Sequence, residues 1–440
     1  MTDAPADPAP VDVALADTSP PAGSRWRLIG PGIVAAATGV GAGDLVATLI
    51  AGSMFGYALL WAALAGTLLK ISLAEAVGRW ALASGRTIFD GWSSLGPGWF
   101  GGRLNWASAY FGVYVVLWGF VYGATAMTAS ALPLAALLDG TGMALDLKSW
   151  AMICGVVGLV LVWFNRYPVF EKLMTGLVAV MFVTVIGLAV IVAPDLPALA
   201  RGLVPTLPEG SAFYTLGLIG GVGGTITLAA YGYWIGEKGW RGPAWIRVMQ
   251  LDNRVGYAVT GIFVVAMLIV GAELLHASGL ALARGDRGLL DLDDVLRERF
   301  GDVVGVMFLV GFFAASFSSL IGVWHGVSLM FADFWAHMRG RADDRAARDE
   351  RSPAFRSYVL WLTFPPMALL FMDRPFGLIV AYGALGALFM PFLAVTLLWL
   401  LNSSRTPAEW RSGWLSNAML SAGGLLFCVL AGREILGLFS

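Results

Sequence analysis

The stretch RLIGPGIVAAATGVGAGDLVATLIAGSMFGY, residues 27–57, decides the fold of this chain. It is apolar over about the length that a helix needs to cross a bilayer. Three of the five residues from Gly39 to Gly43 are glycines, and each costs about 0.8–1 kcal/mol relative to alanine inside a helix. Asp44 follows, and a carboxylate at membrane depth is costly unless it is paired or faces water. The stretch therefore predicts two half-helices around a binding point; the alternative is a glycine-rich face that packs against another helix.

The composition is that of a multi-pass membrane protein. Of the 440 residues, 58% are hydrophobic and 13% are charged, whereas a soluble domain has about 25% charged residues. The net charge of −1 argues against a nucleic-acid partner. Cys154 and Cys428 both lie in apolar runs, so we expect buried thiols and no thiolate metal cluster. The sequence contains no P-loop or similar motif, and we expect neither an enzyme nor a bound cofactor.

Eleven apolar spans follow an N-terminal tail. Residues 1–24 are rich in proline, alanine and aspartate and predict a disordered cytoplasmic tail, while 25–440 predict a single transmembrane domain. The polar segment 278–301 predicts a short surface helix, because three of its leucines have helical spacing. The expected spans are 28–54, 57–82, 105–131, 149–165, 170–193, 211–235, 253–277, 302–332, 356–372, 375–402 and 414–436.

The distribution of basic residues predicts the orientation. Of the 28 lysines and arginines, 19 fall on one alternating set of loops and 8 on the other, and Lys70 lies inside a span. Because cytoplasmic loops carry an excess of lysine and arginine, this pattern predicts a cytoplasmic N-terminus in the inner membrane of the cell.

A second interrupted helix is expected in span six, TLGLIGGVGGTITLAAYGYWIGEKG, residues 215–239. It lies five spans after the first. Two such spans at matching places indicate a transporter built from inverted repeats, here 28–193 and 211–402 with 414–436 as an extra helix, and a site at the membrane midplane. Close helix packing remains the alternative. The candidate substrate-binding residues are Thr38, Gly41, Gly43, Asp44, Gly220, Gly221, Gly223, Gly224, Thr225 and Thr227, with Asp44 as the candidate metal ligand.

Several motifs resemble the Nramp metal-transporter family. They are Gly30-Pro31-Gly32, Gly41-Ala42-Gly43-Asp44, the run from Ala51 to Tyr57, and Leu59-Leu60-Trp61. That family has a similar Gly-Pro-Gly, a metal-binding Asp-Pro-Gly-Asn, a Gly-Ser-x-Phe-Gly-Tyr and a Leu-Leu-Trp at matching spacing. The resemblance implies an all-α membrane protein with the LeuT-type fold, in which helices 1 and 6 are interrupted.

The sequence departs from the family at the metal site. Gly41 stands where the family has its metal-binding aspartate, Ala42 replaces the proline, and Asp44 stands in place of the asparagine. The family's Met-Pro-His in span six corresponds to a stretch near 224–226 that lacks a thioether and an imidazole. Span three has no acidic residue between positions 118 and 129. Oxygen ligands alone suit a hard cation such as magnesium or calcium better than manganese or iron.

Lys70 is a cation inside span two, and no partner lies three or four residues away in its helix. Asp44 is its first candidate partner, either as a structural pair or as a coupling device. Glu75, the third member of this charge group, lies four residues before Arg79 and can pair with it. A fixed ammonium near the site would repel a divalent metal and leaves an anionic or zwitterionic substrate open. Ser318 and Ser319 resemble the hydroxyl pair that sodium-coupled members of this fold place opposite helix 1.

These patterns predict an alternating-access secondary transporter, most consistent with a divalent cation of the hard type. One alternative is a proton- or sodium-coupled transporter of a small anionic or zwitterionic solute, and another is a non-transporting membrane sensor. The expected partners are a small inorganic ion or small solute and the lipid bilayer. The sequence gives no oligomeric state.

Overall fold

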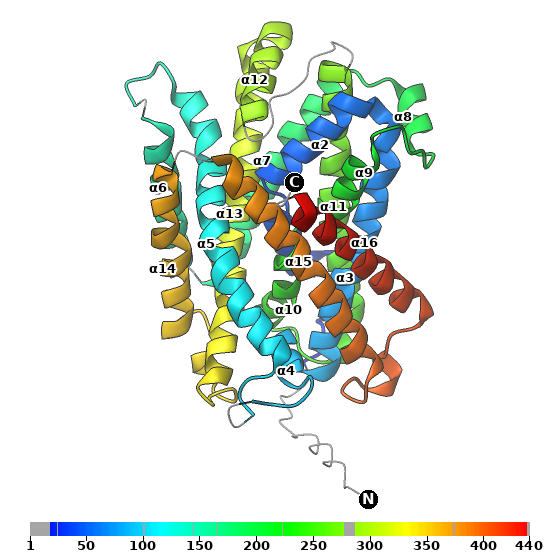
Figure 1. The fold of residues 1–440 in the computed structure, drawn as a ribbon, viewed down its shortest axis with the longest axis vertical. Coiled ribbons are helices and arrows are strands. Elements are labelled where there is room, and N and C mark those ends of the chain that lie inside the picture. The colour runs from blue at the N-terminus through cyan, green and yellow to red at the C-terminus, as the bar shows by residue number, and fades with distance from the viewer. Residues whose placement is uncertain are drawn as a thin grey trace, which may run out of the picture.

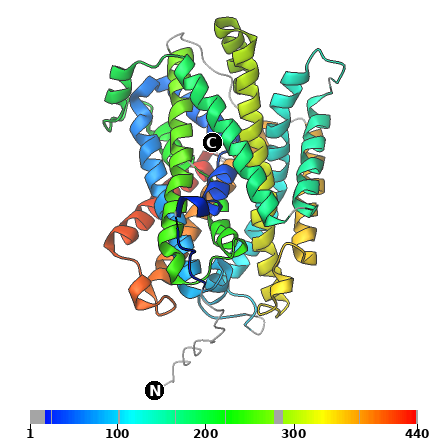
Figure 2. The same cartoon turned by 180° about the vertical axis from the view of Figure 1, so that it is seen from behind.

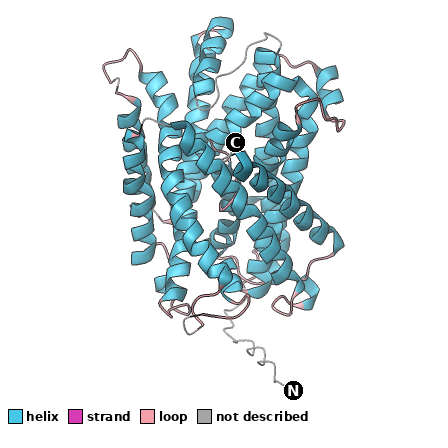
Figure 3. Ribbon diagram, viewed as in Figure 1, coloured by secondary structure: helices cyan, strands magenta, loops and turns pink. Residues whose placement is uncertain are grey.

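The computed structural model describes residues 18–23, 25–99, 102–143, 145–164, 166–221, 223–276, 287–372 and 375–437. These residues form one bundle of helices joined by loops (Figure 1). Figure 3 shows how much of the described chain is helical, and the described residues add one isolated antiparallel bridge between Trp99 and Leu104. Most of the predicted tail, residues 1–17, lies outside the described part.

Helices occupy all eleven predicted spans. In the described part, eight stretches are long and apolar enough to cross a membrane. The spans are formed in order by α1 (Pro31–Gly39) with α2 (Ala42–Phe55), α3 (Leu60–Ser84), α5 (Trp106–Leu138), α6 (Leu147–Phe164), α7 (Tyr167–Ile191), α9 (Ala212–Gly221) with α10 (Thr227–Glu237), α11 (Ile246–Gly271), α13 (Asp302–Met338), α14 (Pro353–Met367), α15 (Pro375–Asn402) and α16 (Trp414–Gly437).

Short helices lie at the two ends of the bundle. We call the end that carries α4 (Ile88–Ser93) the N-terminal face; α8 (Leu196–Gly202) and α12 (Arg287–Phe300) lie at the opposite end (Figure 1). The predicted surface helix is confirmed by α12, whose Leu292 and Leu296 are buried. Apolar residues one turn apart fasten this polar helix to the bundle.

Both predicted interruptions are confirmed. α1 begins with Pro31 at a position that suits proline, ends at Gly39, and is separated from α2 by Val40 and Gly41. In span six, α9 continues to Gly221 and α10 starts at Thr227. The second interruption therefore lies a few residues later than the centre of the glycine cluster.

α1 lies in the middle of the bundle, where it packs against α11 and α13. The view from behind shows this dark-blue start of the chain surrounded by later helices (Figure 2). Gly32 allows the approach, because a Cβ there would overlap the backbone of Asp252. Glycine therefore also has a packing role at Gly32, before the interruption.

The two cysteines differ in environment. Cys154 is buried as expected, but Cys428 is exposed. The expectation of two buried thiols is therefore wrong for Cys428, because α16 turns this side chain away from the bundle.

Candidate ion-binding site

The end of α1 offers backbone carbonyl groups to α13. The Ser319 hydroxyl donates a hydrogen bond to the carbonyl oxygen of Thr38 at 2.8 Å, and the Ser318 hydroxyl lies 3.5 Å from that of Ala37. The last turn of a helix leaves carbonyls without their usual amide partners, although the Ala37 carbonyl also accepts a hydrogen bond from the Val40 amide at 3.3 Å. The predicted serine pair thus meets the interruption of helix 1, and oxygen atoms from α1 and α13 converge there.

Glycine is required in the interruption between α9 and α10. Gly223 and Gly224 have φ values of +73° and +79°, in the left-handed region that favours glycine. A Cβ on Gly223 would also lie 2.7 Å from the ring of Tyr257 in α11. These two residues therefore hold the backbone open between the half-helices.

The two interruptions touch each other. A Cβ on Gly224 would lie 2.9 Å from the Cα of Gly39. Both elements carry free backbone groups, and a half-helix terminus carries a partial charge. Two oxygen atoms beside the second interruption, Thr227 Oγ1 and the hydroxyl of Tyr257, are buried and have no hydrogen-bond partner among the described residues. The contact region can therefore supply oxygen ligands from several elements.

The structure brings some of the predicted site residues to this contact and not others. The Thr38 hydroxyl donates a hydrogen bond to the carbonyl of Val34 at 2.6 Å, and it is the Thr38 carbonyl that meets Ser319. Gly220 packs against Phe427 and Leu430 of α16, and Thr225 lies near Gly386 of α15. Gly41 faces Ser319. Gly43, Asp44 and Gly221 are helical, and their surroundings lie outside the described residues.

Lys70 reaches the second interruption. Its side chain is completely buried, and Nζ donates a hydrogen bond to the carbonyl oxygen of Gly224. Nζ also lies 5.2 Å from the centre of the Phe427 ring, within the range of a cation–π interaction. The ammonium thus joins α3, the interruption and the eleventh helix. Phe427 was not predicted as a site residue, since an aromatic residue in an apolar span gives no signal of its own.

Glu75 belongs to a different set of contacts. It pairs with Arg79 at 3.2 Å, as the spacing predicted, and accepts a hydrogen bond from Gln250 at 3.2 Å. Arg79 also donates a hydrogen bond to the hydroxyl of Ser416 at the start of α16. These contacts fasten the end of α3 to neighbouring elements, and the coupling role of Glu75 stays a prediction.

Tyr122 of α5 is a site residue that the sequence analysis missed. Its hydroxyl lies 3.0 Å from the Ser319 hydroxyl, and its ring stacks on Trp118 with centroids 4.5 Å apart. A tyrosine in the middle of a long apolar span could have been noticed, because a buried phenol usually finds a hydrogen-bond partner.

Asp252 holds the start of α1. Its carboxylate accepts hydrogen bonds from the amides of Gly30 at 2.7 Å and Gly32 at 2.6 Å, and from the hydroxyl of Tyr231 at 2.9 Å. The first amides of a helix lack partners and carry partial positive charge. Next to this contact, Glu171 of α7 pairs with Lys238 beyond α10. Asp252 was not predicted as a site residue, because the expected span began one residue after it.

A second polar cluster lies at the N-terminal face. Asp333 of α13 is completely buried and accepts hydrogen bonds from Tyr233 of α10 at 2.7 Å and from Thr87 at 2.6 Å. Arg348 contacts Asp333 at 2.7 Å and Asp90 at 2.9 Å. His337 lies between the same two carboxylates. Asp90, Asp333 and His337 could together hold a metal ion, but the Arg348 guanidinium already forms ion pairs with both carboxylates.

His325 of α13 also connects α10 with the segment before α14. Its Nδ1 accepts a hydrogen bond from the indole of Trp234 at 3.0 Å, and its Nε2 lies 2.8 Å from Glu350. An accepting Nδ1 leaves the proton on Nε2, which can donate to the carboxylate. His325 therefore has the hydrogen-bonding role that is usual for a buried histidine.

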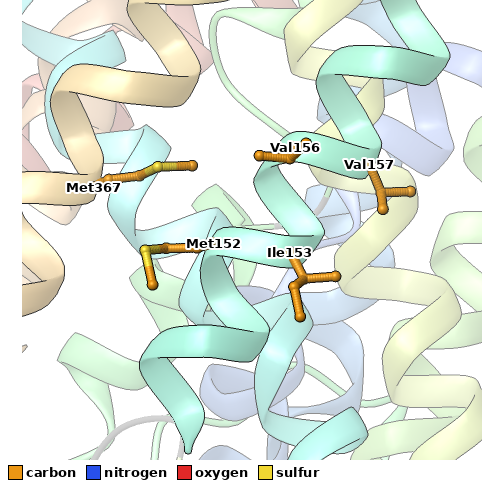
Figure 4. Close-up of a pocket in the computed structure, with 5 residues that line it drawn as sticks. All are labelled: Met152, Ile153, Val156, Val157 and Met367. Carbon is orange, nitrogen blue, oxygen red and sulfur yellow. The ribbon is translucent and has the colours of Figure 1, made fainter. Parts of the chain in front are cut away.

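A hollow on the outside of the bundle is not part of this site. It lies between α6 and α14 and is lined by apolar side chains (Figure 4), namely Met152, Ile153, Val156, Val157 and Met367. These side chains suit contact with lipid chains.

Two interrupted helices that meet inside a membrane-spanning bundle define a secondary transporter of the LeuT-type fold. The family described as natural resistance-associated macrophage protein-like (Nramp) matches residues 32–437. The chain belongs to the Nramp family and is a multi-pass membrane transporter.

Individual relatives agree with this assignment. The divalent metal cation transporters MntH of Deinococcus radiodurans and of Mycobacterium tuberculosis H37Rv are 26% and 25% identical to this chain. The aligned regions cover 69% of both chains in the first case, and 71% of this chain and 72% of the relative in the second.

Solved structures support the fold. The manganese transporter of Eremococcus coleocola, bound to an aromatic bis-isothiourea compound, matches 98% of this chain and 92% of its own length, with a TM-score of 0.73 and 15% identity. Mhp1, a nucleobase-cation-symport-1 family transporter, matches with a TM-score of 0.60 and 13% identity over 93% of this chain and 91% of its own. The chain therefore has the predicted LeuT-type fold, with two inverted five-helix repeats and an eleventh helix.

Proposed function

We propose that this chain moves a divalent cation across the inner membrane by alternating access, with its N-terminus in the cytoplasm. The observation that carries the proposal is the backbone contact between the interruptions of helices 1 and 6 at Gly39 and Gly224. An ion bound at such a contact meets carbonyl groups and half-helix ends from both repeats. The names of the relatives, divalent metal cation transporters and a manganese transporter, favour a metal substrate.

A hard cation such as magnesium suits the donors better than manganese or iron. The Gly224 carbonyl and the hydroxyls of Thr227 and Tyr257 are oxygen donors, and Asp44 is the candidate carboxylate in the first turn of α2. Hard cations take oxygen ligands, while thioether and imidazole groups favour softer transition metals. Gly41 supplies no side-chain ligand where the family has its metal-binding aspartate.

Lys70 favours a second candidate function. A buried ammonium that donates to the Gly224 carbonyl repels a metal ion at the same place, and it attracts an anionic group. A small anionic or zwitterionic solute, moved together with protons or sodium, fits this charge. Ser318 and Ser319, together with the Ala37 and Thr38 carbonyls, are then the candidate sodium ligands. In both candidate functions we propose that Asp44 and Lys70 act as one electrostatic unit.

Uptake into proteoliposomes across a panel of divalent cations and small solutes tests the proposal. If a metal is the substrate, Lys70→Met keeps or increases magnesium uptake, because a repelling charge is removed. If an anionic solute is the substrate, the same variant abolishes its uptake. The folding of each variant is checked first by size-exclusion chromatography. Wild-type rates and pH dependence in well-folded Lys70→Met and Asp44→Asn proteins would show that the pair is only structural.

A further inference from the structure

The Lys70 ammonium contacts two groups that attract cations, a backbone carbonyl and an aromatic ring. The Lys70 side chain extends from α3 to the interruption between α9 and α10, and there it meets the Gly224 carbonyl. The ring of Phe427 covers Nζ from the side of α16. A carbonyl oxygen and the face of an aromatic ring both prefer a cation over a neutral group. The side chain has no exposed surface, so bulk water contributes little to this preference.

We infer that the Lys70 ammonium is a tethered cation that occupies the cation position at the interruption of helix 6. An incoming cation and the ammonium compete for the same carbonyl oxygen. Lys70 is then a residue that determines specificity, because it lowers the affinity of the site for any ion that needs the Gly224 carbonyl. The position itself accepts an ammonium group on an alkyl chain. This inference rests on the proposed role of the two interruptions as the ion site.

The ammonium position makes a specific prediction for a truncated side chain. Lys70→Ala removes three methylene groups and the ammonium, which together correspond to n-propylammonium. We expect purified Lys70→Ala protein to unfold at a lower temperature than the wild type. Added n-propylammonium chloride is expected to raise the Tm of this variant with increasing concentration, because a ligand that binds the native state stabilises it. The wild type fills the position with its own side chain and is expected to show no such shift.

Controls separate charge, shape and salt effects. Propan-1-ol has the same chain without the charge, and N-methyl-D-glucamine chloride supplies ionic strength; neither is expected to raise the Tm. Lys148 is a matched control, because its Nζ lies 5.6 Å from the Phe371 ring on an exposed part of the chain. Lys148→Ala is expected to keep the wild-type Tm, and added n-propylammonium is expected to leave that Tm unchanged. Adding Phe427→Leu to Lys70→Ala is expected to reduce the shift.

The outcome is decisive in both directions. A folded Lys70→Ala protein that responds no more to n-propylammonium than the wild type does, or responds equally to propan-1-ol, overturns the inference. If the variant does not fold alone, recovery of monodisperse protein from membranes solubilised with n-propylammonium, and not with propan-1-ol, supports it; no recovery contradicts it. A parallel titration with magnesium chloride keeps the two proposals apart. Rescue by the amine without any magnesium effect on Lys70→Met or the wild type preserves this inference and weakens the divalent-cation proposal.

Discussion

Gly39 lies against Gly223 so closely that a methyl group on Gly39 would overlap the carbonyl of Gly223. This contact joins the end of α1 to the interruption of helix 6, and it connects the two inverted repeats at the middle of the bundle. No side chain mediates it, so the distance between the repeats depends on the absence of a Cβ at this position.

We expect Gly39→Ala to lower stability and to abolish transport. The added methyl group forces two backbone segments apart, and overpacking of this kind costs about 1–3 kcal/mol. Thermal unfolding in detergent and proteoliposome uptake measure the two effects. Gly217→Ala in α9 is the matched control, because a Cβ there meets no atom within 4 Å; alanine is expected to stabilise that helix by up to about 1 kcal/mol. Equal behaviour of the two variants would argue against the contact.

Asp252→Ala is expected to release the start of α1. It leaves the amides of Gly30 and Gly32 without their acceptor, and each unsatisfied buried group costs about 1–3 kcal/mol. Tyr231→Phe leaves both amide hydrogen bonds to Asp252 in place and removes only the hydroxyl, which is shared between Asp252 and the Met249 carbonyl; it should cost about 1 kcal/mol. Thermal unfolding compares the two, and limited proteolysis before α1 reports its release. Unchanged proteolysis in Asp252→Ala would show that other contacts hold the helix.

Arg348→Ala should destabilise the N-terminal face strongly. It leaves Asp333 and Asp90 with less positive charge in a buried setting, and removal of one partner of a buried pair typically costs about 3–5 kcal/mol. Arg345→Ala, an exposed arginine of the same loop, should change stability by about 0.5 kcal/mol at most. Similar unfolding temperatures for both variants would mean that the cluster contributes little.

Asp90 is expected to make the folding stability of the protein decrease at acidic pH. Burial acts to raise the pKa of this carboxyl, but the hydrogen bond from His337 and the charge of Arg348 outweigh it and hold the pKa below its ordinary value. A carboxyl with a lowered folded-state pKa stabilises the protein above its unfolded-state pKa of about 4. That stability is lost as the pH falls further. We expect Asp90→Asn to have a lower Tm at pH 7 and a smaller decrease in Tm between pH 5 and pH 3 than the wild type; parallel curves would contradict this.

Manganese is expected to bind weakly. The site lacks the thioether and the aspartate that the resemblance places in the family's metal site, so we expect a Kd on the order of 1 mM or weaker, about −4 kcal/mol. Isothermal titration calorimetry of the purified protein measures this directly. Micromolar or tighter manganese binding that disappears in Asp44→Ala would overturn the assignment of a hard cation.

Local sequence determined the membrane spans and both interruptions. Span length follows from the thickness of the bilayer, so apolar runs alone predicted helices in the right places. The interruptions follow from backbone preferences: Gly223 and Gly224 adopt positive φ values, which residues with a Cβ rarely adopt. The pairing of Glu75 with Arg79 is likewise a property of helical spacing.

Only the tertiary structure decided which polar groups meet. Lys70 could be recognised in the sequence as a cation that needs a partner, but its contacts with Gly224 and Phe427 join residues more than 150 positions apart. Asp252 and Asp333 likewise accept hydrogen bonds from residues that are more than 150 positions away in the chain. A buried charge must find compensation, and sequence shows that need. Which atom provides it depends on how the helices pack, because side-chain periodicity defines the face of a helix and not the neighbour that covers it.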